Sequence, residues 1–436
     1  MHRIHSGLTV AVAVKNGSTD SLRRILRQLN TGENECLSNF INSKTALFIS
    51  GVIIPEQDYH GELLPETLVL ATTYCGPLSE HLNDIIQTNK NALVEIFRHC
   101  NGFPEEGLIS DENVLYFLKY NSYFSAFNSR HNCITKEDVQ NEKHLREEIE
   151  NYIDRPRALN AFKDRKAVEI KSLIQRHIMA LGDDYQWAQK QANKTYFEFI
   201  ATNLVPVFFI ILLSILVTLS IIYPCFLINL LILLVVLILA VLAMILFITR
   251  KRTPTVQRPD DEYVRKIAAT QLNPVLNGMT AAAPLKQGKL RRYFYASALR
   301  IAAFFKHSVM DVPTVSSIRW LVIDQKKRLL FFSNYANTTD FYVRDFLNGT
   351  TTPRGVNFMF SNGMGFPDAK LLVMTGIKSD PEGYMNAVHS GQQVTDLWYA
   401  HDKNLTAEMI NKNRKLRNGL FRQMSERKAI EWLKLL

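Results

Sequence analysis

Histidine is the side chain that most often ligates haem or metals or transfers protons near neutral pH, and this chain has 11 histidines. They are isolated, and no H-x-x-x-H or H-E-x-x-H spacing occurs, so the sequence predicts no metal site. His401 is the one candidate for binding a cofactor, because it follows Trp398-Tyr399-Ala400, an aromatic run with the composition of a strand. Haem is the cofactor that such a histidine would suggest, and the competing interpretation is an ordinary core or surface histidine. No catalytic residue can be assigned.

Several other motifs lack the residues that their chemistry needs. The glycines of residues 361–365 are not followed by Lys and Ser or Thr, so this segment is predicted to be a turn rather than a phosphate-binding loop. Tyr74 and Tyr335 end two similar apolar runs, and shared packing explains them more simply than a shared pocket. The five cysteines are scattered without a C-x-x-C pair, which argues against a disulfide framework or zinc site and fits a reducing compartment.

A cluster of basic and aromatic residues suggests contact with a lipid surface. Lys286, Lys289, Arg291 and Arg292 precede three aromatic residues, 293–295. Such a segment can rest on anionic headgroups, although a solvated helix face would have the same composition. The net charge of +10 also favours anionic partners, and because no nucleic-acid motif occurs we expect the bilayer and no nucleic acid.

The elements that would position these residues are organised around a long apolar segment. Residues 199–249 contain no Asp, Glu, Lys, Arg or His, and Pro224 separates two apolar runs, 205–222 and 227–248. Each run can cross roughly 30 Å of hydrocarbon, whereas one continuous helix would be far longer than a bilayer is thick. Since proline interrupts a helix, the sequence predicts a two-helix transmembrane hairpin over residues 200–250.

The basic residues at the ends of the hairpin predict its orientation. Arg250, Lys251 and Arg252 follow the second run, and Lys190 and Lys194 precede the first. Cytoplasmic flanks carry an excess of Lys and Arg, so both soluble parts are expected on the cytoplasmic side of the inner membrane, with residues 250–252 at its surface. Because the runs contain no ionisable group, the hairpin is expected to anchor rather than transport.

The soluble parts on either side of the hairpin look like two copies of one module. The matching segments occur in the same order in both parts and are 67–74 with 328–335, 79–100 with 339–347, 102–104 with 365–367, 114–118 with 371–375, 124–127 with 398–401, and 134–146 with 405–417. Segments 114–118 and 371–375 are expected to form strands. The last pair is expected to form helices with Thr135 and Thr406 as N-caps.

Strands predicted at 8–14, 45–54 and 67–74, with a helix at 20–29, give the first copy a ferredoxin-like order, β-α-β-β-α-β. The second copy departs from this order, because its opening segment, 289–306, has a helical composition. The predicted domains are a first module (1–152), an amphipathic stalk or packed helix (153–199), the hairpin (200–250), a proline-rich linker (251–288) and a second module (289–436).

Three motifs of the second copy, at residues 332–335, 365–367 and 398–400, resemble those of a group of uncharacterised bacterial membrane proteins. Their duplicated ferredoxin-like modules are similar to the dimeric α/β-barrel superfamily. The resemblance implies an α+β fold in which two such modules flank the hairpin. That superfamily includes dye-decolourising peroxidases, chlorite dismutase-like proteins and small monooxygenases. The peroxidase motif G-x-x-D-G is absent here, so no catalytic residue is transferred.

Two functions remain open from the sequence. The first is a membrane-anchored binding or scaffold protein whose two modules pair at the bilayer surface, within one chain or in a homo-oligomer. The second is a haem- or monooxygenase-type oxidoreductase that acts on a lipophilic substrate near the membrane. Whether the chain is an enzyme is left undecided by these residues.

Overall fold

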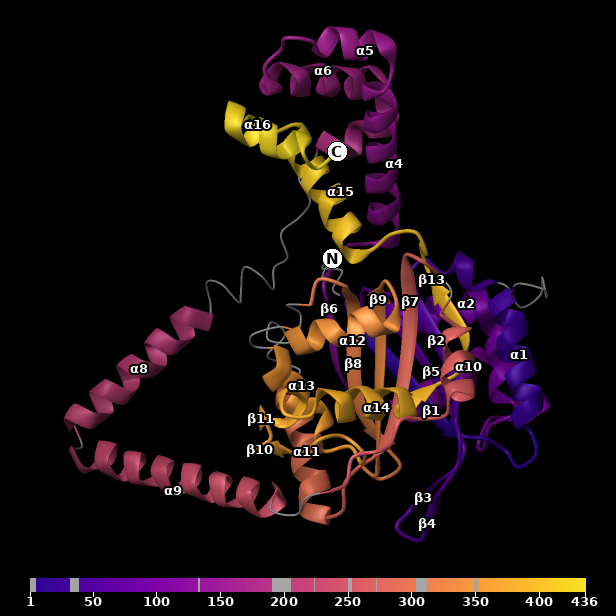
Figure 1. Cartoon of the computed structure of the whole chain (residues 1–436), viewed down its shortest axis with the longest axis vertical. Coiled ribbons are helices and arrows are strands. Elements are labelled where there is room, and N and C mark those ends of the chain that lie inside the picture. Colours follow the sequence, from indigo (N-terminus) through magenta and orange to yellow (C-terminus); the bar gives the residue numbers. More distant parts are fainter. Residues whose placement is uncertain are drawn as a thin grey trace.

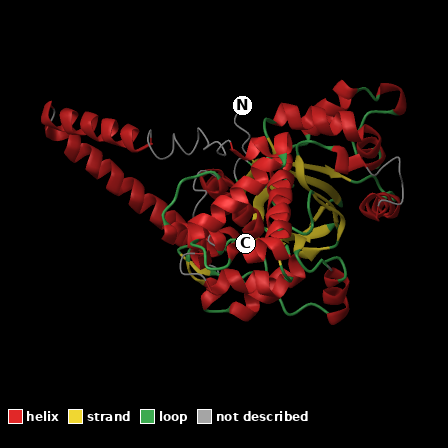
Figure 2. Cartoon of the chain, turned by 90° about the horizontal axis from the view of Figure 1, so that it is seen from above, coloured by secondary structure: helices red, strands yellow, loops and turns green. Residues whose placement is uncertain are grey.

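The computed structural model describes residues 5–31, 39–131, 134–189, 205–222, 224–249, 253–271, 273–302, 312–348 and 352–436. These residues form a mixed α+β architecture built on antiparallel sheets (Figures 1 and 2). Two large sheets face each other across a shared apolar layer, and helices cover their outer faces. Two further groups of helices extend away from this body, at the top and at the left of Figure 1.

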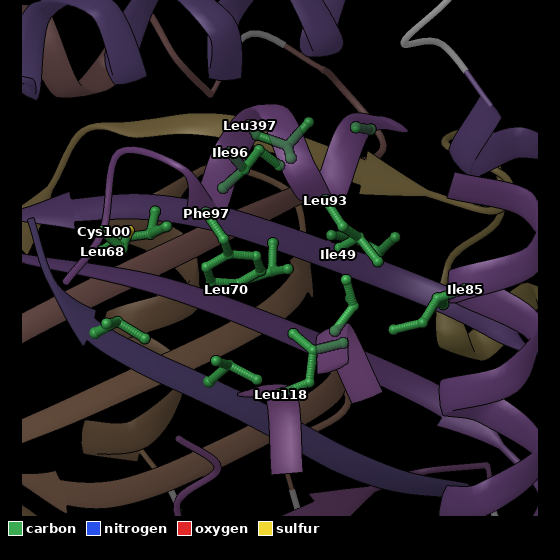
Figure 3. Close-up of a cluster of buried hydrophobic side chains, with 14 of the residues drawn as sticks. Ile49, Leu68, Leu70, Ile85, Leu93, Ile96, Phe97, Cys100, Leu118 and Leu397 are labelled. Atoms are coloured by element: carbon green, nitrogen blue, oxygen red, sulfur yellow. The ribbon is translucent and has the colours of Figure 1, made fainter. Parts of the chain in front are cut away.

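The first sheet has the strand order β1-β5-β2-β13. Its strands are β1 (His5–Ala13), β5 (Thr67–Cys75), β2 (Ala46–Ile54) and β13 (Thr395–Ala400), and its outer face is covered by α1 (Thr19–Thr31), α2 (Leu78–Phe97) and α3 (Asp111–Tyr120). The strand β13 comes from the other end of the chain. Figure 3 shows Leu397 of β13 among core residues of the first half such as Ile49 and Phe97.

The second sheet has the strand order β12-β7-β9-β8-β6. Its strands are β12 (Gln392–Gln393), β7 (Leu276–Pro284), β9 (Arg328–Ala336), β8 (Val315–Ile323) and β6 (Ser125–Ser129), and its outer face is covered by α11 (Lys289–Ala302), α12 (Thr339–Asn348), α13 (Thr352–Phe360) and α14 (Pro381–Gly391). Here it is β6, from the first half of the chain, that joins strands of the second half.

The two halves of the chain therefore exchange their final strands. Phe127 in β6 is the cross-strand partner of Arg319 in β8, and Trp398 in β13 is the partner of Ser50 in β2. Just before β6 the backbone still bonds the first sheet, through Tyr123 N–H to the Thr9 carbonyl (2.8 Å), and just before β13 the strand β12 pairs with β7. Each exchanged segment covers edges of both sheets, which leaves fewer unpaired backbone groups.

The strand pairs of the two halves share an irregularity. The register between β2 and β5 shifts between Ala46 and Phe48, and the register between β8 and β9 shifts between Val315 and Ser317. A bulge adds one residue to one strand and increases its twist, so both sheets bend at the corresponding place. The smaller elements are β3 (Gln57–Tyr59), β4 (Glu62–Leu64), β10 (Ala369–Lys370), β11 (Met374–Thr375), η1 (Asn39–Asn42), η2 (Glu106–Leu108) and η5 (Gly376–Lys378).

A helical layer follows each exchanged strand. As predicted, Thr135 caps α4 and Thr406 caps α15, each by accepting a hydrogen bond from a backbone N–H in the first turn. The layer consists of α4 (Lys136–Ile153), α5 (Pro156–Phe162), α6 (Ala167–Ala180), η3 (Gly182–Gln189), α15 (Ala407–Leu420) and α16 (Glu426–Leu433). Its members share one core, so the described part of residues 153–199 packs against helices from both halves of the chain.

Two apolar helices, α8 (Val205–Ile222) and α9 (Pro224–Thr249), contact each other and project from the body (Figure 2). Among the described residues, Ile228–Thr249 is long and apolar enough to cross a membrane by length and composition, and Ile210–Leu219 is a shorter apolar helix. Apolar side chains along both helices are exposed, including Leu213 and Leu233.

Two predicted elements were wrong. Residues 114–118 were predicted to form a strand but lie in α3, because Ser110 caps the helix and acidic residues occupy its first turn, where they favour the helix dipole. Residues 371–375, their presumed counterpart, contribute only the two residues of β11, and Leu371, Leu372 and Thr375 have positive φ.

The predicted linker, residues 251–288, is also corrected. Its described part contains α10 (Asp261–Ala268) and the nine-residue strand β7. β7 occupies the place that β1 has in the first half, since β7 pairs with β9 as β1 pairs with β5. Prolines 274 and 284 at the ends of this segment suggested a linker, but a proline at a strand end leaves the interior ladder intact.

Candidate functional site

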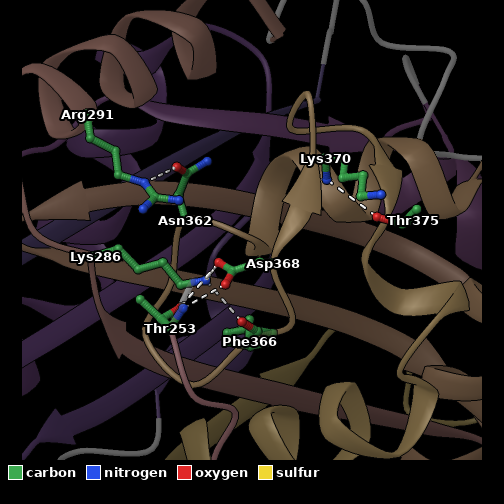
Figure 4. Close-up of polar contacts among 8 residues, drawn as sticks. All are labelled: Thr253, Lys286, Arg291, Asn362, Phe366, Asp368, Lys370 and Thr375. Carbon is green, nitrogen blue, oxygen red and sulfur yellow. Dashed lines mark hydrogen bonds and ion pairs between the residues drawn. The ribbon is translucent and has the colours of Figure 1, made fainter. Parts of the chain in front are cut away.

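Lys286 and Arg291, predicted at the membrane surface, are instead buried in the second half, where Figure 4 shows both. Lys286 Nζ donates to Asp368 Oδ1 (2.5 Å) and to the Phe366 carbonyl (3.0 Å), and Arg291 Nε donates to Asn362 Oδ1 (2.9 Å). Burial lowers the pKa of Lys286 to about 8, which the bond to Asp368 opposes. A run of basic residues in a sequence does not show whether their side chains lie on the surface or are buried in ion pairs.

The cluster around Asp368 also holds the chain where it returns from α9. Thr253 donates its backbone N–H to Asp368 Oδ2 (2.7 Å), and its hydroxyl donates to Asp368 Oδ1 (3.2 Å). The neighbouring Val256 N–H bonds the Gly365 carbonyl (3.2 Å). We call Thr253, Lys286 and Asp368 the Asp368 latch, because they fasten the end of the apolar segment to the second half.

The remaining predicted membrane-surface residues have different environments. Lys289 is exposed, and the guanidinium of Arg292 lies over the Tyr59 ring (5.6 Å to its centroid). Arg250, Lys251 and Arg252 lie outside the described residues. The segment at 361–365 is a turn, as predicted. Tyr74 and Tyr335 are both buried against rings on helices, His81 and Tyr342, which agrees with the packing role expected for them.

His401 follows β13, and its backbone N–H donates to the Leu47 carbonyl (2.9 Å). Its ring lies between a small cavity of about 40 Å³, which His5 and His131 also line, and a larger groove. Both ring nitrogens are buried, neither has a hydrogen-bond partner among the described residues, and burial lowers the pKa of His401 to about 4. The ring is therefore held neutral near pH 7.

These features do not fit a haem ligand. The small cavity is far below the size of a porphyrin, and the shielded nitrogens of His401 could not reach an iron in the groove unless the ring turned. Among the residues that the structure describes, no group of three or more His, Cys, Asp and Glu could hold a metal ion.

The groove beside His401 is the candidate binding site of the described part of the chain. We define the Trp398 groove as two adjoining hollows of about 430 and 600 Å³ that share Asn30, Trp398 and Lys403. Such volumes suit a small molecule. Its walls come from α1, α4, α10 and β13, so both halves of the chain contribute. The exchanged strand places Trp398 here.

Trp398 is held rigidly. Its indole Nε1 donates to Asn334 Oδ1 (3.0 Å) in the second sheet, and its backbone N–H donates to Asn30 Oδ1 (3.0 Å) in α1. The indole also lies directly on Gly278 of β7, where a Cβ would overlap with it. A fixed aromatic face at the rim of a groove can bind a flat or apolar group.

The groove carries excess positive charge. Its lining includes Arg27, Lys136, Lys266 and Lys403 but only two carboxylates, and both of these are in ion pairs. Asp396 accepts hydrogen bonds from Arg23 (3.3 Å) and Arg27 (2.9 Å), and Asp402 accepts one from Lys143 (2.8 Å).

Lys136 and Lys403 flank the aromatic side chains of β13. Lys136 Nζ donates to the Tyr399 hydroxyl (3.2 Å), and Lys403 Nζ lies 5.6 Å from the Trp398 ring centroid. The aromatic run at 398–400 was noticed in the sequence, but these lysines were not, because they belong to distant segments that carry no shared motif.

Comparison with known proteins adds no identification. No family model matches the chain, and no curated protein or solved structure matches it.

Proposed function

We propose that this chain is a membrane-anchored binding protein, in which one apolar hairpin holds a paired module at the cytoplasmic face of the inner membrane. The observation that carries the proposal is the strand exchange. β6 belongs to the sheet of the second half and β13 to the sheet of the first, although the hairpin separates the two halves in sequence. Two halves that share strands must lie on the same side of a bilayer.

The proposal includes a duplicated, ferredoxin-like module. Each half runs strand, helix, strand, strand, helices, strand, and then a Thr-capped helix. The central strand order β1-β5-β2 corresponds to β7-β9-β8, and both carry the bulge at the same place. Two such modules packed sheet to sheet have the architecture expected of a dimeric α/β barrel formed within one chain.

The membrane part of the proposal rests on α8 and α9. The described parts of both helices contain no Asp, Glu, Lys, Arg or His, and their exposed apolar surface would be costly in water. The two helices project together, so the chain can enter and leave the bilayer on one side. The Asp368 latch lies directly after α9, where a connection between anchor and body is needed.

Alkaline carbonate extraction and cysteine labelling of the full chain test this proposal. Glu105→Cys and Lys378→Cys place thiols at exposed positions, one in each half. We expect the chain to stay in the membrane pellet. We also expect a membrane-impermeant maleimide to label both thiols in inverted vesicles and neither in intact cells, with the unsubstituted chain as the control for native cysteines. Release by carbonate, or labelling of the two halves from opposite sides, would contradict it.

A further inference from the structure

We propose that the Trp398 groove binds an organic anion, a carboxylate or phosphate attached to a flat apolar body. This inference names the ligand class of the binding function proposed above and rests on it. It does not depend on how the chain is anchored.

The first argument compares two corresponding places in the fold. Phe127 is paired with Arg319 and packs on Gly7, and Trp398 is paired with Ser50 and packs on Gly278. At the Phe127 place the guanidinium of Arg319 lies 5.2 Å from the ring centroid and fills the space between the sheets.

At the Trp398 place the paired residue is Ser50. Its side chain is too short to reach from one sheet to the other, as the side chain of Arg319 does. The indole of Trp398 donates a hydrogen bond to Asn334. Asn334 has the same place in the second half that Thr73, which accepts a hydrogen bond from Arg319, has in the first half. The structure has an open groove beside Trp398. A buried cation therefore lies against the ring at the Phe127 place, whereas the ring at the Trp398 place borders a groove that is lined by cations.

The second argument is the chemistry of the groove wall. Lys136, Lys266 and Lys403 reach it from three separate elements, and its carboxylates are already neutralised by arginine or lysine. An entering anion would gain charge-assisted hydrogen bonds without meeting an unpaired acid. A cationic ligand would meet the opposite field.

The third argument is the apolar share of the wall. Leu29, Phe40 and Leu397 line the larger hollow together with Trp398 and Tyr399. Aromatic faces and aliphatic side chains favour a ligand that buries a ring or chain rather than a bare inorganic ion. Lysines at the rim and apolar groups between them fit an anionic head on an apolar body.

Titration calorimetry of the full chain in neutral detergent tests this with 1-naphthyl phosphate as the probe. Inorganic phosphate tests the anion alone, and 1-naphthol tests the apolar body alone. We expect 1-naphthyl phosphate to bind at least tenfold more tightly than either. Lys403→Gln should weaken its binding by roughly tenfold, the loss expected for one charge-assisted contact. Lys289→Gln, at an exposed lysine that does not line the groove, should leave the affinity unchanged.

Lys266→Gln provides a second, independent test, because Lys266 reaches the groove from α10 rather than from the segment after β13. We expect it also to weaken binding of 1-naphthyl phosphate by roughly tenfold while circular dichroism remains native. Equal binding of 1-naphthol and 1-naphthyl phosphate, or unchanged affinity in Lys403→Gln, would overturn the proposal.

Competition with vesicles identifies the source of the anion. Displacement of 1-naphthyl phosphate by phosphatidylglycerol vesicles, but not by phosphatidylcholine vesicles, would assign the groove to a lipid headgroup. Failure of both to compete would assign it to a soluble organic anion. If 1-naphthyl phosphate does not bind while the chain remains carbonate-resistant with both halves cytoplasmic, the ligand class is wrong and the anchored, paired module stands.

Discussion

Arg319 shows how a single residue can decide the shape of the interior. Its side chain crosses from β8 to the first sheet, where it donates to the Leu8 carbonyl (2.9 Å) and to the hydroxyls of Thr9 and Thr73. Burial lowers the pKa of Arg319 to about 9, so it remains a cation near neutral pH. Its described hydrogen-bond acceptors are all neutral, and the Phe127 ring lies beside it. Arg319 thus joins the two sheets and fills the space beside Phe127.

Buried histidines should make the protein sensitive to acid. Burial lowers the pKa of His5 to about 4 and the pKa values of His81 and His131 to about 3, whereas unfolded histidines titrate near 6.5. As the pH falls below about 6.5, the unfolded state takes up protons that the folded state does not, so stability decreases. We predict a lower melting temperature at about pH 4.5 than at about pH 7.5.

His81→Gln should reduce this acid-induced drop. The neutral ring of His81 bonds the hydroxyls of Thr45 and Thr72 (both 2.8 Å), and glutamine can retain a hydrogen bond without titrating. Asp84, which raises the pKa of His81, and Arg319, which lowers it, are unchanged in this variant. The matched control is His60→Gln at an exposed position. A drop as large in His81→Gln as in the native chain would show that His81 does not contribute.

Gly278 should be intolerant of any side chain. A Cβ at this position would overlap with the indole of Trp398, which cannot move without losing its bond to Asn334. We predict that Gly278→Ala lowers the free energy of unfolding by about 1–3 kcal/mol, as overpacking does. Gly107→Ala, where nothing lies within 4 Å of the new Cβ, is the control. Equal stability of the two variants in chemical denaturation would refute the close packing.

At the scale of elements, we predict that two variants of the Asp368 latch lose stability to different extents. Asp368→Ala leaves the fully buried ammonium of Lys286 without its carboxylate and should cost about 3–5 kcal/mol of stability. Lys286→Met should cost less, because the Asp368 side chain is 24% exposed and keeps its bonds to Thr253. Both can be measured by denaturation in detergent, and Asp261→Ala at an exposed ion pair should change little. A larger loss in Lys286→Met would reverse the proposed order.

Elements with local signals were predictable from the sequence, and those defined by distant partners were not. The Thr135 and Thr406 caps are local, and both were predicted correctly. The predicted surface role of Lys286 failed because its partner, Asp368, is 82 residues away. His401 does lie beside a groove, yet the burial of its ring nitrogens depends on packing that no motif reports. The groove lysines belong to separate segments that only the fold brings together.

At the scale of the whole molecule, the strand exchange is the feature that organises the rest. The sequence suggested two copies that pair, but it did not indicate that their last strands are exchanged. β6 and β8 contain residues that are nearly 200 positions apart, and antiparallel pairing at that separation leaves no trace in local composition. The exchange also explains why the Trp398 groove has walls from both halves.

A disulfide between exchanged strands tests this architecture most directly. Ser129 in β6 and Ser317 in β8 are cross-strand partners, and Ser→Cys changes little volume at either position. In oxidised native membranes, Ser129→Cys/Ser317→Cys should form an intrachain bond, seen as a linked peptide in a chain that migrates as a monomer, and neither single variant should form it. A covalent dimer linked through these residues, or their failure to link at all, would contradict a pairing of the two halves within one chain.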